Sequence, residues 1–442
     1  MPAERRNGGR SGVLGTILGL ALALGVAGCW DYREPNRVAF IQALAVDQEP
    51  DGRVAVTALV DVPAGMAGQG GGMGGGTGQG EGRPWLVQQG SGRTLAEALL
   101  EMSKFTGRAL TSSQCRAVLF SEEVARGGLN RFTGLLTRWF EYRTSMAILV
   151  TKGRARDCLK VESPLERDPV DFLVDLLSSG QQFGTTLNFQ LLDLMTQLSN
   201  YEREAVIPVV APRRPDAGGG QGKSGQGQGK TPSEAVEIVA LAVFRGDRMV
   251  GELGPEDTSY YLMLAGRHRS SFLVLADPKV RGKYVAVRVN RVRRKVETRL
   301  KGGRPEVEVR LLVPLELLEI QSTVNYTGRR FRPVLEEAAA KRIAAGCRRV
   351  VGKAQRQWQA DIFAWGSHFK MRFLTWPDWV RFGWLSRQFP RARVKVAVSA
   401  KVRRPGTTLQ PTKPVPAPSG SGAREFSVRR RGSTIRGRPA LR

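Results

Sequence analysis

The sequence predicts an α+β protein with more than one domain. The chain has 442 residues, of which 41% are hydrophobic, enough for two or three domains with sizeable cores. Segments that alternate apolar and polar residues are interspersed with segments of helical spacing. Two stretches, residues 65–80 and 213–234, are rich in Gly and have the composition of unpacked connections. We therefore expect a multi-domain fold with antiparallel sheets and one long C-terminal helix.

The two Gly-rich stretches have different expected roles. Strand-like sequence flanks residues 65–80, which favours a loop inside a first domain of residues 29–212. Residues 213–234 are interpreted as a linker to a second domain, residues 235–404, with a subdivision near position 325. Pro, Gly, Ser and Arg dominate residues 405–442, and this composition indicates a disordered basic tail.

The first domain alternates strand and helix signals. Two strands, residues 40–46 and 54–62, are joined by a turn at Pro50-Asp51-Gly52. Three helix starts carry capping residues, namely Thr94 with Glu97, Ser121, and Asp168 followed by Pro169. The helix after Asp168 is expected to run through Leu177. The remaining expected elements are strands at 117–120, 147–150 and 205–210 and a helix at 187–198.

The second domain is expected to contain a hairpin, further strands and the long helix. Residues 238–244 and 249–251 indicate the hairpin, and residues 284–289, 306–315 and 393–403 alternate with period 2. A helix over residues 333–363 is predicted from its apolar stripe. The stripe consists of Leu335, Ala339, Ile343, Cys347, Val350, Ala354 and Trp358.

The N-terminus has the layout of a bacterial lipoprotein signal peptide, residues 1–28. Three basic residues open the chain: Arg5, Arg6 and Arg10. The uncharged run at residues 13–27 is shorter than the roughly 20 apolar residues of a membrane span. It ends in a lipobox-like pattern, Val26, Ala27, Gly28 and Cys29. In lipoproteins such a cysteine is diacylated and becomes the first residue; an ordinary signal peptide that contains a cysteine is the alternative.

Lipid on Cys29 is the expected membrane anchor. Each buried methylene contributes about 0.8 kcal/mol, and one acyl chain alone binds only marginally. A covalent diacylglycerol, with or without an N-acyl chain on Cys29, therefore anchors the chain durably, and no other cofactor and no metal is expected. No other run of about 18 or more apolar residues follows, so we expect no further span.

The other three cysteines are expected to be buried apolar residues. Cys115, Cys158 and Cys347 are widely spaced. The sequence contains no CxxC pair, so it predicts neither a zinc site nor a disulfide framework.

The net charge of +28 favours an anionic partner. Nucleic acid, acidic lipid and an acidic protein surface all fit the charge alone. Basic clusters occur at residues 289–295 and 429–431, but no nucleic-acid module accompanies them. Export to a membrane makes an anionic membrane surface the favoured partner, and no nucleic acid is expected. A nucleic-acid or cell-wall polyanion binder remains an alternative.

The sequence carries no catalytic signature that we can identify. Residues 217–224 resemble a relaxed Walker A loop, but they lack the preceding strand and following helix that a phosphate site needs. The two histidines, His268 and His368, show no metal-site spacing, and His268 between two arginines is expected to be exposed. We therefore expect a protein that is not an enzyme.

Two stretches carry recognisable motifs: residues 28–36 contain Trp30, Asp31, Glu34 and Asn36, and residues 355–366 contain Gln355, Asp361, Phe363 and Gly366. Both stretches resemble the Ger(x)C family, the C subunits of spore germinant receptors. Residues 28–36 resemble the start of the mature family, and residues 355–366 are similar to the segment that closes the family's long helix. Segments 93–103, 117–127, 138–153 and 240–253 also look like family elements, in the same order. The Gly-rich insertions, the basic tail and Pro35 depart from the pattern.

This resemblance implies a lipid-anchored, non-catalytic subunit on the outer face of the cell or spore inner membrane. It would act in nutrient-triggered germination beside multi-span A and B subunits. The alternative is a lipoprotein that captures a nutrient in a cleft between its domains and passes it to a permease-like partner. Trp30 would lie at the lipid interface or, alternatively, pack on its own domain.

Overall fold

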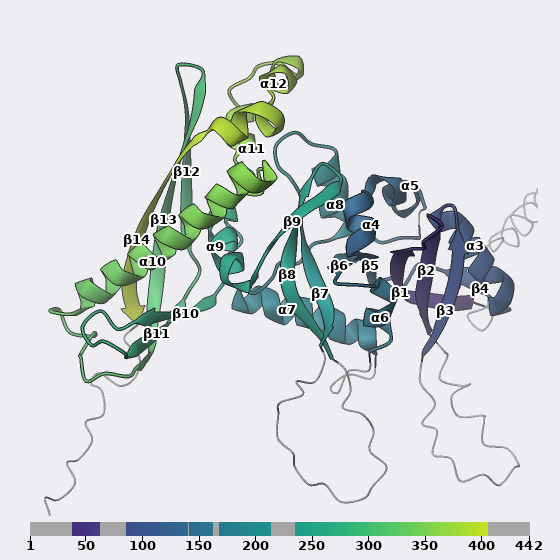
Figure 1. The fold of residues 1–442 in the computed structure, drawn as a ribbon, viewed down its shortest axis with the longest axis horizontal. Coiled ribbons are helices and arrows are strands. Elements are labelled where there is room, and N and C mark those ends of the chain that lie inside the picture. The colour runs from purple at the N-terminus through teal and green to yellow at the C-terminus, as the bar shows by residue number, and fades with distance from the viewer. Residues whose placement is uncertain (1–37, 62–84, 140, 162–167, 214–234, 405–442) are drawn as a thin grey trace, which may run out of the picture.

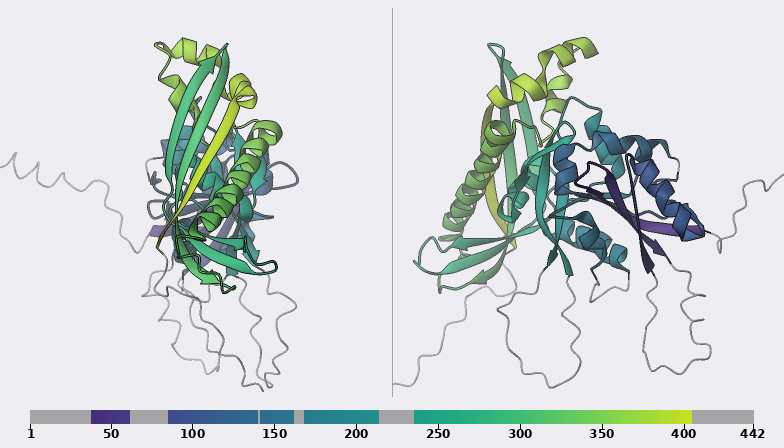
Figure 2. Two further views of the ribbon diagram at one scale, coloured as in Figure 1. Left: turned by 90° about the vertical axis from the view of Figure 1, so that its left-hand side faces the viewer. Right: turned by 45° about the vertical axis from the view of Figure 1, so that its right-hand side comes forward.

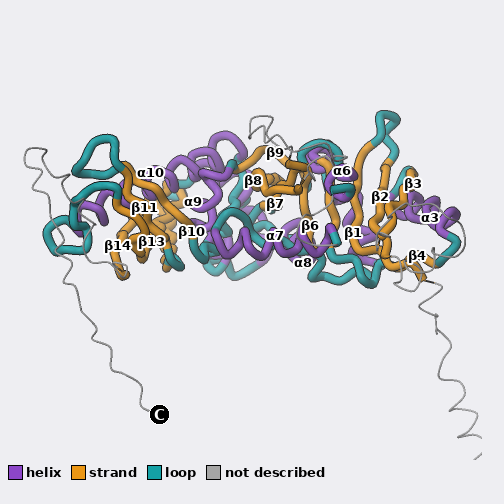
Figure 3. The backbone as a smooth tube through the Cα atoms, turned by 90° about the horizontal axis from the view of Figure 1, so that it is seen from below, coloured by secondary structure: helices purple, strands orange, loops and turns teal. Residues whose placement is uncertain are grey.

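The computed structural model describes residues 38–61, 85–139, 141–161, 168–213 and 235–404. These residues form two β-sheets that follow one another along the long axis of the molecule (Figure 1). Helix α9 (Pro255–Ala265) lies between the two sheets (Figure 3). The expected mixture of helices and sheets, with a long helix in the C-terminal half, is confirmed.

The first sheet has nine strands and is mixed rather than antiparallel. Its order is β3-β2-β1-β5-β6-β7-β8-β9, and β4 pairs with one end of β1. The four central strands β1, β5, β6 and β7 are parallel, and antiparallel strands flank them on both sides. The strands are β1 (Val38–Gln48), β2 (Val54–Asp61), β3 (Trp85–Gly92), β4 (Ala109–Thr111), β5 (Ala117–Ser121), β6 (Ala147–Thr151), β7 (Val206–Arg213), β8 (Ala235–Arg245) and β9 (Arg248–Leu253).

Helical connections explain the parallel centre, because parallel neighbours need a crossover. The helices are α3 (Leu95–Thr106), α4 (Glu122–Gly127), α5 (Asn130–Arg138), α6 (Ala155–Leu159), α7 (Pro169–Phe183) and α8 (Leu191–Leu198). Every residue of β5 and β6 is buried, as expected for strands covered on both faces. Leu119 packs in a core with α6 and α7, whereas its neighbour Phe120 packs in the core with α5.

The three predicted helix starts are confirmed. The side chains of Thr94, Ser121 and Asp168 accept hydrogen bonds from the backbone N–H groups of Glu97, Val124 and Val170. Helix α7 continues to Phe183, beyond the predicted end at Leu177, and Gly184 in the left-handed region ends it. The predicted helix at 187–198 begins only at Leu191.

The second sheet is organised around one long strand, β13 (Arg304–Ile320). Strands β11 (Tyr284–Val289) and β12 (Arg293–Lys301) pair with successive parts of β13, both antiparallel. Strand β10 (Ser271–Ala276) extends β11, and β14 (Arg393–Arg404) pairs with β13 in parallel. The predicted antiparallel sheet is therefore found here except at β14.

The long helix α10 (Arg332–Lys353) packs against this sheet (Figure 2). All seven residues of the predicted apolar stripe are buried. The helix continues as one π-helical turn, η2 (Ala354–Trp358), and ends there rather than at residue 363. The chain reverses because Gln359 has a φ of 52°, in the left-handed region.

The first sheet extends past the predicted boundary between domains. Strands β8 and β9, which belong to the predicted second domain, continue this sheet: β8 pairs antiparallel with β7, and β9 pairs with β8 at the edge. Pairing the apolar strands β7 and β8 buries both, which explains why they belong to one sheet. The predicted signal peptide, the Gly-rich loop, residues 214–234 and the basic tail lie outside the described residues.

Candidate functional site

The N-terminal candidate residues lie outside the described residues. These are the lipobox Val26, Ala27 and Gly28, the lipidation residue Cys29, and the motif residues Trp30, Asp31, Glu34 and Asn36. Their roles remain predictions. The described part of the chain begins at Val38, nine positions after Cys29.

The C-terminal motif residues surround one buried carboxylate, that of Asp361. Its Oδ1 accepts from the backbone N–H of Phe363 at 2.9 Å. Its Oδ2 accepts from the N–H of Gly366 at 3.0 Å and from the indole Nε1 of Trp384 at 2.7 Å. These bonds tie together the chain reversal after η2, the start of α11 (Gly366–Lys370) and η3 (Trp384–Gln388).

Asp361 is also joined through its backbone to a second buried acid, Glu204. The backbone N–H of Glu204 donates to the carbonyl oxygen of Asp361 at 2.8 Å, and the Glu204 side chain accepts from the N–H of Gly246 at 2.8 Å. Burial raises the pKa of Asp361 to about 6, opposed by its hydrogen bonds. Burial also raises the pKa of Glu204 to about 7, with a smaller contribution from the charge of Asp361.

Phe363 and Gly366 are fixed by close packing around this carboxylate. The ring of Phe363 stacks on Trp365 with centroids 4.4 Å apart. A Cβ on Gly366 would lie 2.3 Å from the carbonyl oxygen of Glu202 and 2.5 Å from Trp384 Cδ1, so only glycine fits.

Gln355 connects the long helix to the last strand. Its Nε2 donates to the carbonyl oxygens of Phe389 at 3.0 Å and Ala392 at 2.8 Å, which fixes η4 (Phe389–Arg391) just before β14. We name Gln355, Asp361, Phe363, Gly366, Trp384 and Glu204 the Asp361 cluster. It joins the segment before β7 to the segment between α10 and β14, so it links the two sheets.

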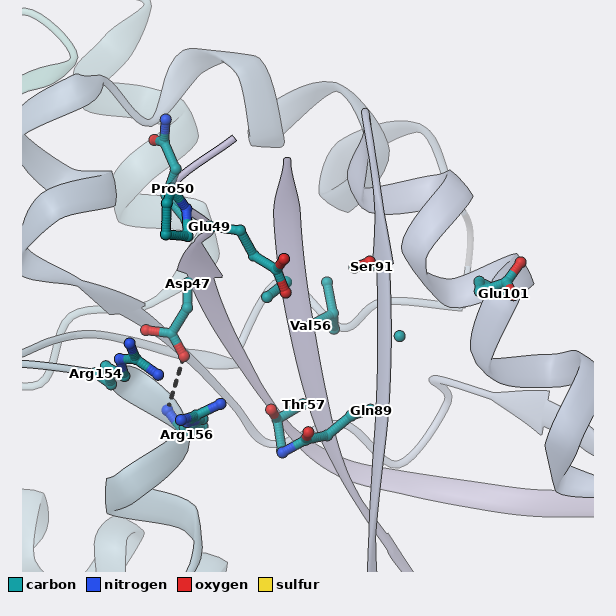
Figure 4. Close-up of a pocket in the computed structure, with 13 residues that line it drawn as sticks. Asp47, Glu49, Pro50, Val56, Thr57, Gln89, Ser91, Glu101, Arg154 and Arg156 are labelled. Carbon is teal, nitrogen blue, oxygen red and sulfur yellow. Dashed lines mark hydrogen bonds between the residues drawn. The ribbon is translucent and has the colours of Figure 1, made fainter. Parts of the chain in front are cut away.

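A hollow of about 530 Å³ lies at one end of β1 and β2, inside the N-terminal part (Figure 4). Charges of both signs line it, contributed by Asp47, Glu49, Glu101, Arg154 and Arg156. Asp47 is largely buried and accepts from the backbone N–H groups of Ala155 at 2.7 Å and Arg156 at 3.0 Å. Burial raises the pKa of Asp47 despite these bonds.

Sequence reasoning missed the hollow and Glu204. The predicted strand at 40–46 ends directly before Asp47, but nothing local indicates that Arg154 and Arg156 lie beside it. They reach it because β1, β5 and β6 are neighbouring parallel strands, and α6 directly follows β6.

His268 is buried, so the prediction that it is exposed is wrong. Its Nε2 lies 2.9 Å from the hydroxyl of Ser271, and burial lowers its pKa to about 4. The turn at Gly266 after α9 directs His268 inward between two more exposed arginines.

The cysteine prediction is confirmed. Cys115, Cys158 and Cys347 are buried and unpaired, and burial raises the pKa of each thiol to about 12. Within the described ranges, no group of three or more His, Cys, Asp or Glu side chains is arranged to hold a metal ion. In the same ranges, no helix is both long and apolar enough to cross a membrane.

Comparisons with known proteins agree with the sequence resemblance. The family model described as "Spore germination protein N-terminal domain" matches residues 31–212. The model "Spore germination B3/ GerAC like, C-terminal" matches residues 240–406. YfkR of Bacillus subtilis is 28% identical over 309 residues, which are 70% of this chain and 75% of YfkR. Spore germination protein KC of the same organism is 22% identical over 403 residues, 90% of this chain and 97% of KC.

The fold also matches a solved structure. The crystal structure of the GerBC protein has a TM-score of 0.50 at 15% identity, and the match covers 82% of this chain and 97% of GerBC. At this identity the likeness shows the fold alone. The two family models together span most of the described chain. The chain therefore belongs to the Ger(x)C family, the C subunits of spore germinant receptors.

Proposed function

We propose that the protein is a lipid-anchored C subunit that acts in nutrient-triggered germination by binding, without catalysis. One observation carries this proposal: the family match begins at residue 31, directly after the lipobox and Cys29. A lipoprotein whose mature chain starts at Cys29 therefore has the family motif at its N-terminus.

The short distance in sequence between Cys29 and β1 constrains where the folded part lies. Nine residues extend at most about 30 Å. A lipid on Cys29 thus keeps β1 and its neighbours close to the membrane. Two or three acyl chains hold the protein there durably, since each buried methylene contributes about 0.8 kcal/mol.

The proposed partners are membrane-embedded A and B subunits. Anchoring confines all three proteins to one surface, which raises their effective concentration, so weak contacts suffice for assembly. The anchored subunit belongs on the outer face of the cell or spore inner membrane, because lipoprotein processing follows export.

Replacing the anchor residue tests this proposal. Cys29→Ala should move the protein from the membrane fraction to the soluble fraction and reduce nutrient germination, whereas dodecylamine-triggered germination stays normal. Cys115→Ala is the matched control, because Cys115 is buried and free and its loss leaves the anchor intact. If Cys29→Ala stayed in the membrane fraction, anchoring through Cys29 would be wrong.

A second candidate function is capture of a small nutrient. The hollow beside Asp47 supports it, since carboxylates and guanidinium groups together suit a ligand that carries both charges, such as a free amino acid. The hollow lies within the first sheet, not between the two sheets as the capture hypothesis expected. Saturable thermal stabilisation by one amino acid, lost in Arg154→Gln, would favour this function; a flat response to an amino-acid panel would reject it.

A further inference from the structure

One end of the second sheet exposes large apolar side chains to water. Leu374 is 102% exposed and Met371 is 82% exposed, the two highest values among the large hydrophobic residues that the structure describes. Trp376 and Val380 beside them are also exposed. Contiguous exposed apolar residues mark interaction sites more often than isolated ones do.

Two segments far apart in sequence build this end of the molecule. One runs through α11 and α12 (Trp376–Phe382), and the other is the turn between β12 and β13 (Figure 1). The hydroxyl of Thr298 donates to the carbonyl oxygen of His368 at 3.5 Å, and the guanidinium of Arg372 contacts the carbonyl oxygen of Thr298. We name residues 299–304 and 370–381 the tip surface.

A rigid aromatic base holds the exposed side chains in place. The ring of Phe373 lies 4.9 Å from that of Phe382 and 5.6 Å from that of Trp379, which is buried. Thr375 caps α12, since the backbone N–H of Asp378 donates to its hydroxyl at 3.3 Å. Met371 and Leu374 therefore project from a well-packed support.

The tip surface is also basic. Its two segments contain six basic residues and one acidic residue, Asp378. The basic residues are Arg299, Lys301, Arg304, Lys370, Arg372 and Arg381. Lys370, Arg299 and Arg381 are paired with Glu202, Glu297 and Asp378, respectively. The other three basic residues keep the tip surface positive, which opposes docking of a second copy through the same surface and favours an anionic partner.

We propose that the tip surface inserts into the interfacial region of an anionic lipid bilayer. Leu374 and Met371 enter the acyl boundary, Trp376 lies at headgroup level, and the surrounding arginines and lysines meet lipid phosphates. Projecting side chains fit a fluid bilayer without a complementary pocket. This contact is additional to the proposed lipid on Cys29, and it uses a different part of the molecule.

A fluorescent probe at position 374 tests the insertion. The lipidated full chain carrying Leu374→Cys is labelled with an environment-sensitive dye and placed in vesicles of phosphatidylcholine and phosphatidylglycerol. The three internal native cysteines are buried, and their high pKa keeps them protonated, so they react poorly with the dye. Val274→Cys is the matched control, because Val274 is exposed on β10 at the opposite end of the second sheet (Figure 1).

Insertion predicts a blue-shifted emission and quenching by acyl-chain nitroxides at position 374 but not at 274. Each basic residue near an anionic surface changes binding about fivefold. Arg299→Gln with Lys301→Gln should therefore weaken the shift, as should vesicles of phosphatidylcholine alone. No shift at 374 in a chain that stays on the vesicles would overturn this inference and leave the Cys29 anchor intact. A shift seen only with the A and B subunits present would show protein docking and also overturn it.

Discussion

Residues 354–391 contribute to two contrasting regions of the molecule, the Asp361 cluster and the tip surface. At the Asp361 cluster, every polar atom of the carboxylate is used inside the fold. At the tip surface, Met371 and Leu374 contribute almost nothing to internal packing. Both regions are rich in aromatic residues, so amino-acid composition does not distinguish them. The family motif lies in the Asp361 cluster, which stabilises the fold, whereas the exposed tip surface is where we expect a partner to bind.

Removing the Asp361 carboxylate should produce the largest effect. Asp361→Ala leaves three buried N–H donors without an acceptor, each costing about 1–3 kcal/mol. We expect a loss of about 3 kcal/mol or more in the free energy of unfolding, measured by urea denaturation. Asp175→Ala on the exposed face of α7 is the control and should change little. Equal losses of stability in the two variants would contradict the claim that the Asp361 cluster stabilises the fold.

Two glycine substitutions should change the stability of the protein in opposite directions. Gly366→Ala forces a Cβ against the Glu202 carbonyl oxygen and Trp384, and overpacking of this kind costs roughly 1–3 kcal/mol. Gly134→Ala, in helix α5 with open space around it, should stabilise by up to about 1 kcal/mol. The midpoints of thermal unfolding of the two variants check this pair. Stabilisation by both would mean that Gly366 is not closely packed.

The ionisation of Glu204 should make stability depend on pH. The pKa of Glu204 is raised from 4.5 to about 7 in the folded chain, so the folded state keeps a proton that the unfolded state releases between these values. This group therefore lowers stability as pH rises from 4.5 to 7, by up to about 3 kcal/mol. Glu204→Gln can still accept from the N–H of Gly246 and should remove that loss.

Wild type must be compared with Glu204→Gln because His268 changes the pH dependence of stability in the opposite direction. Its pKa is lowered to about 4, so its contribution to stability grows as pH rises toward its ordinary value of 6.5. Urea unfolding of wild type and Glu204→Gln across this range cancels the His268 contribution, which both proteins share, and leaves the part due to Glu204 and its coupling to Asp361. Parallel stability curves for the two proteins would show that Glu204 ionises at its ordinary pKa.

Local signals predicted the elements well, and the pairing of strands less well. The capping residues Thr94, Ser121 and Asp168 each mark a helix start because they act within a few residues. The parallel centre of the first sheet depends on which strands meet after three crossovers that contain helices, and no local pattern encodes this pairing. The end of the long helix was misplaced because the reversal occurs at Gln359, without Gly or Pro to signal it.

For the candidate site, too, the sequence predicted individual residues better than the contacts between them. Family resemblance identified Gln355, Asp361, Phe363 and Gly366, but their contacts with Trp384 and Glu204 depend on tertiary structure. His268 appeared exposed because its two neighbours are arginines, yet a single turn places it inside. The N-terminal motif is known from sequence only.

The mass of the mature N-terminal peptide tests the central claim most directly. Protein purified from membranes of a sporulating host should begin at Cys29 and carry a diacylglyceryl group, with residues 1–28 removed. An N-terminal peptide that retains residues before Cys29, or that carries an unmodified Cys29 thiol, would contradict a lipid-anchored receptor subunit.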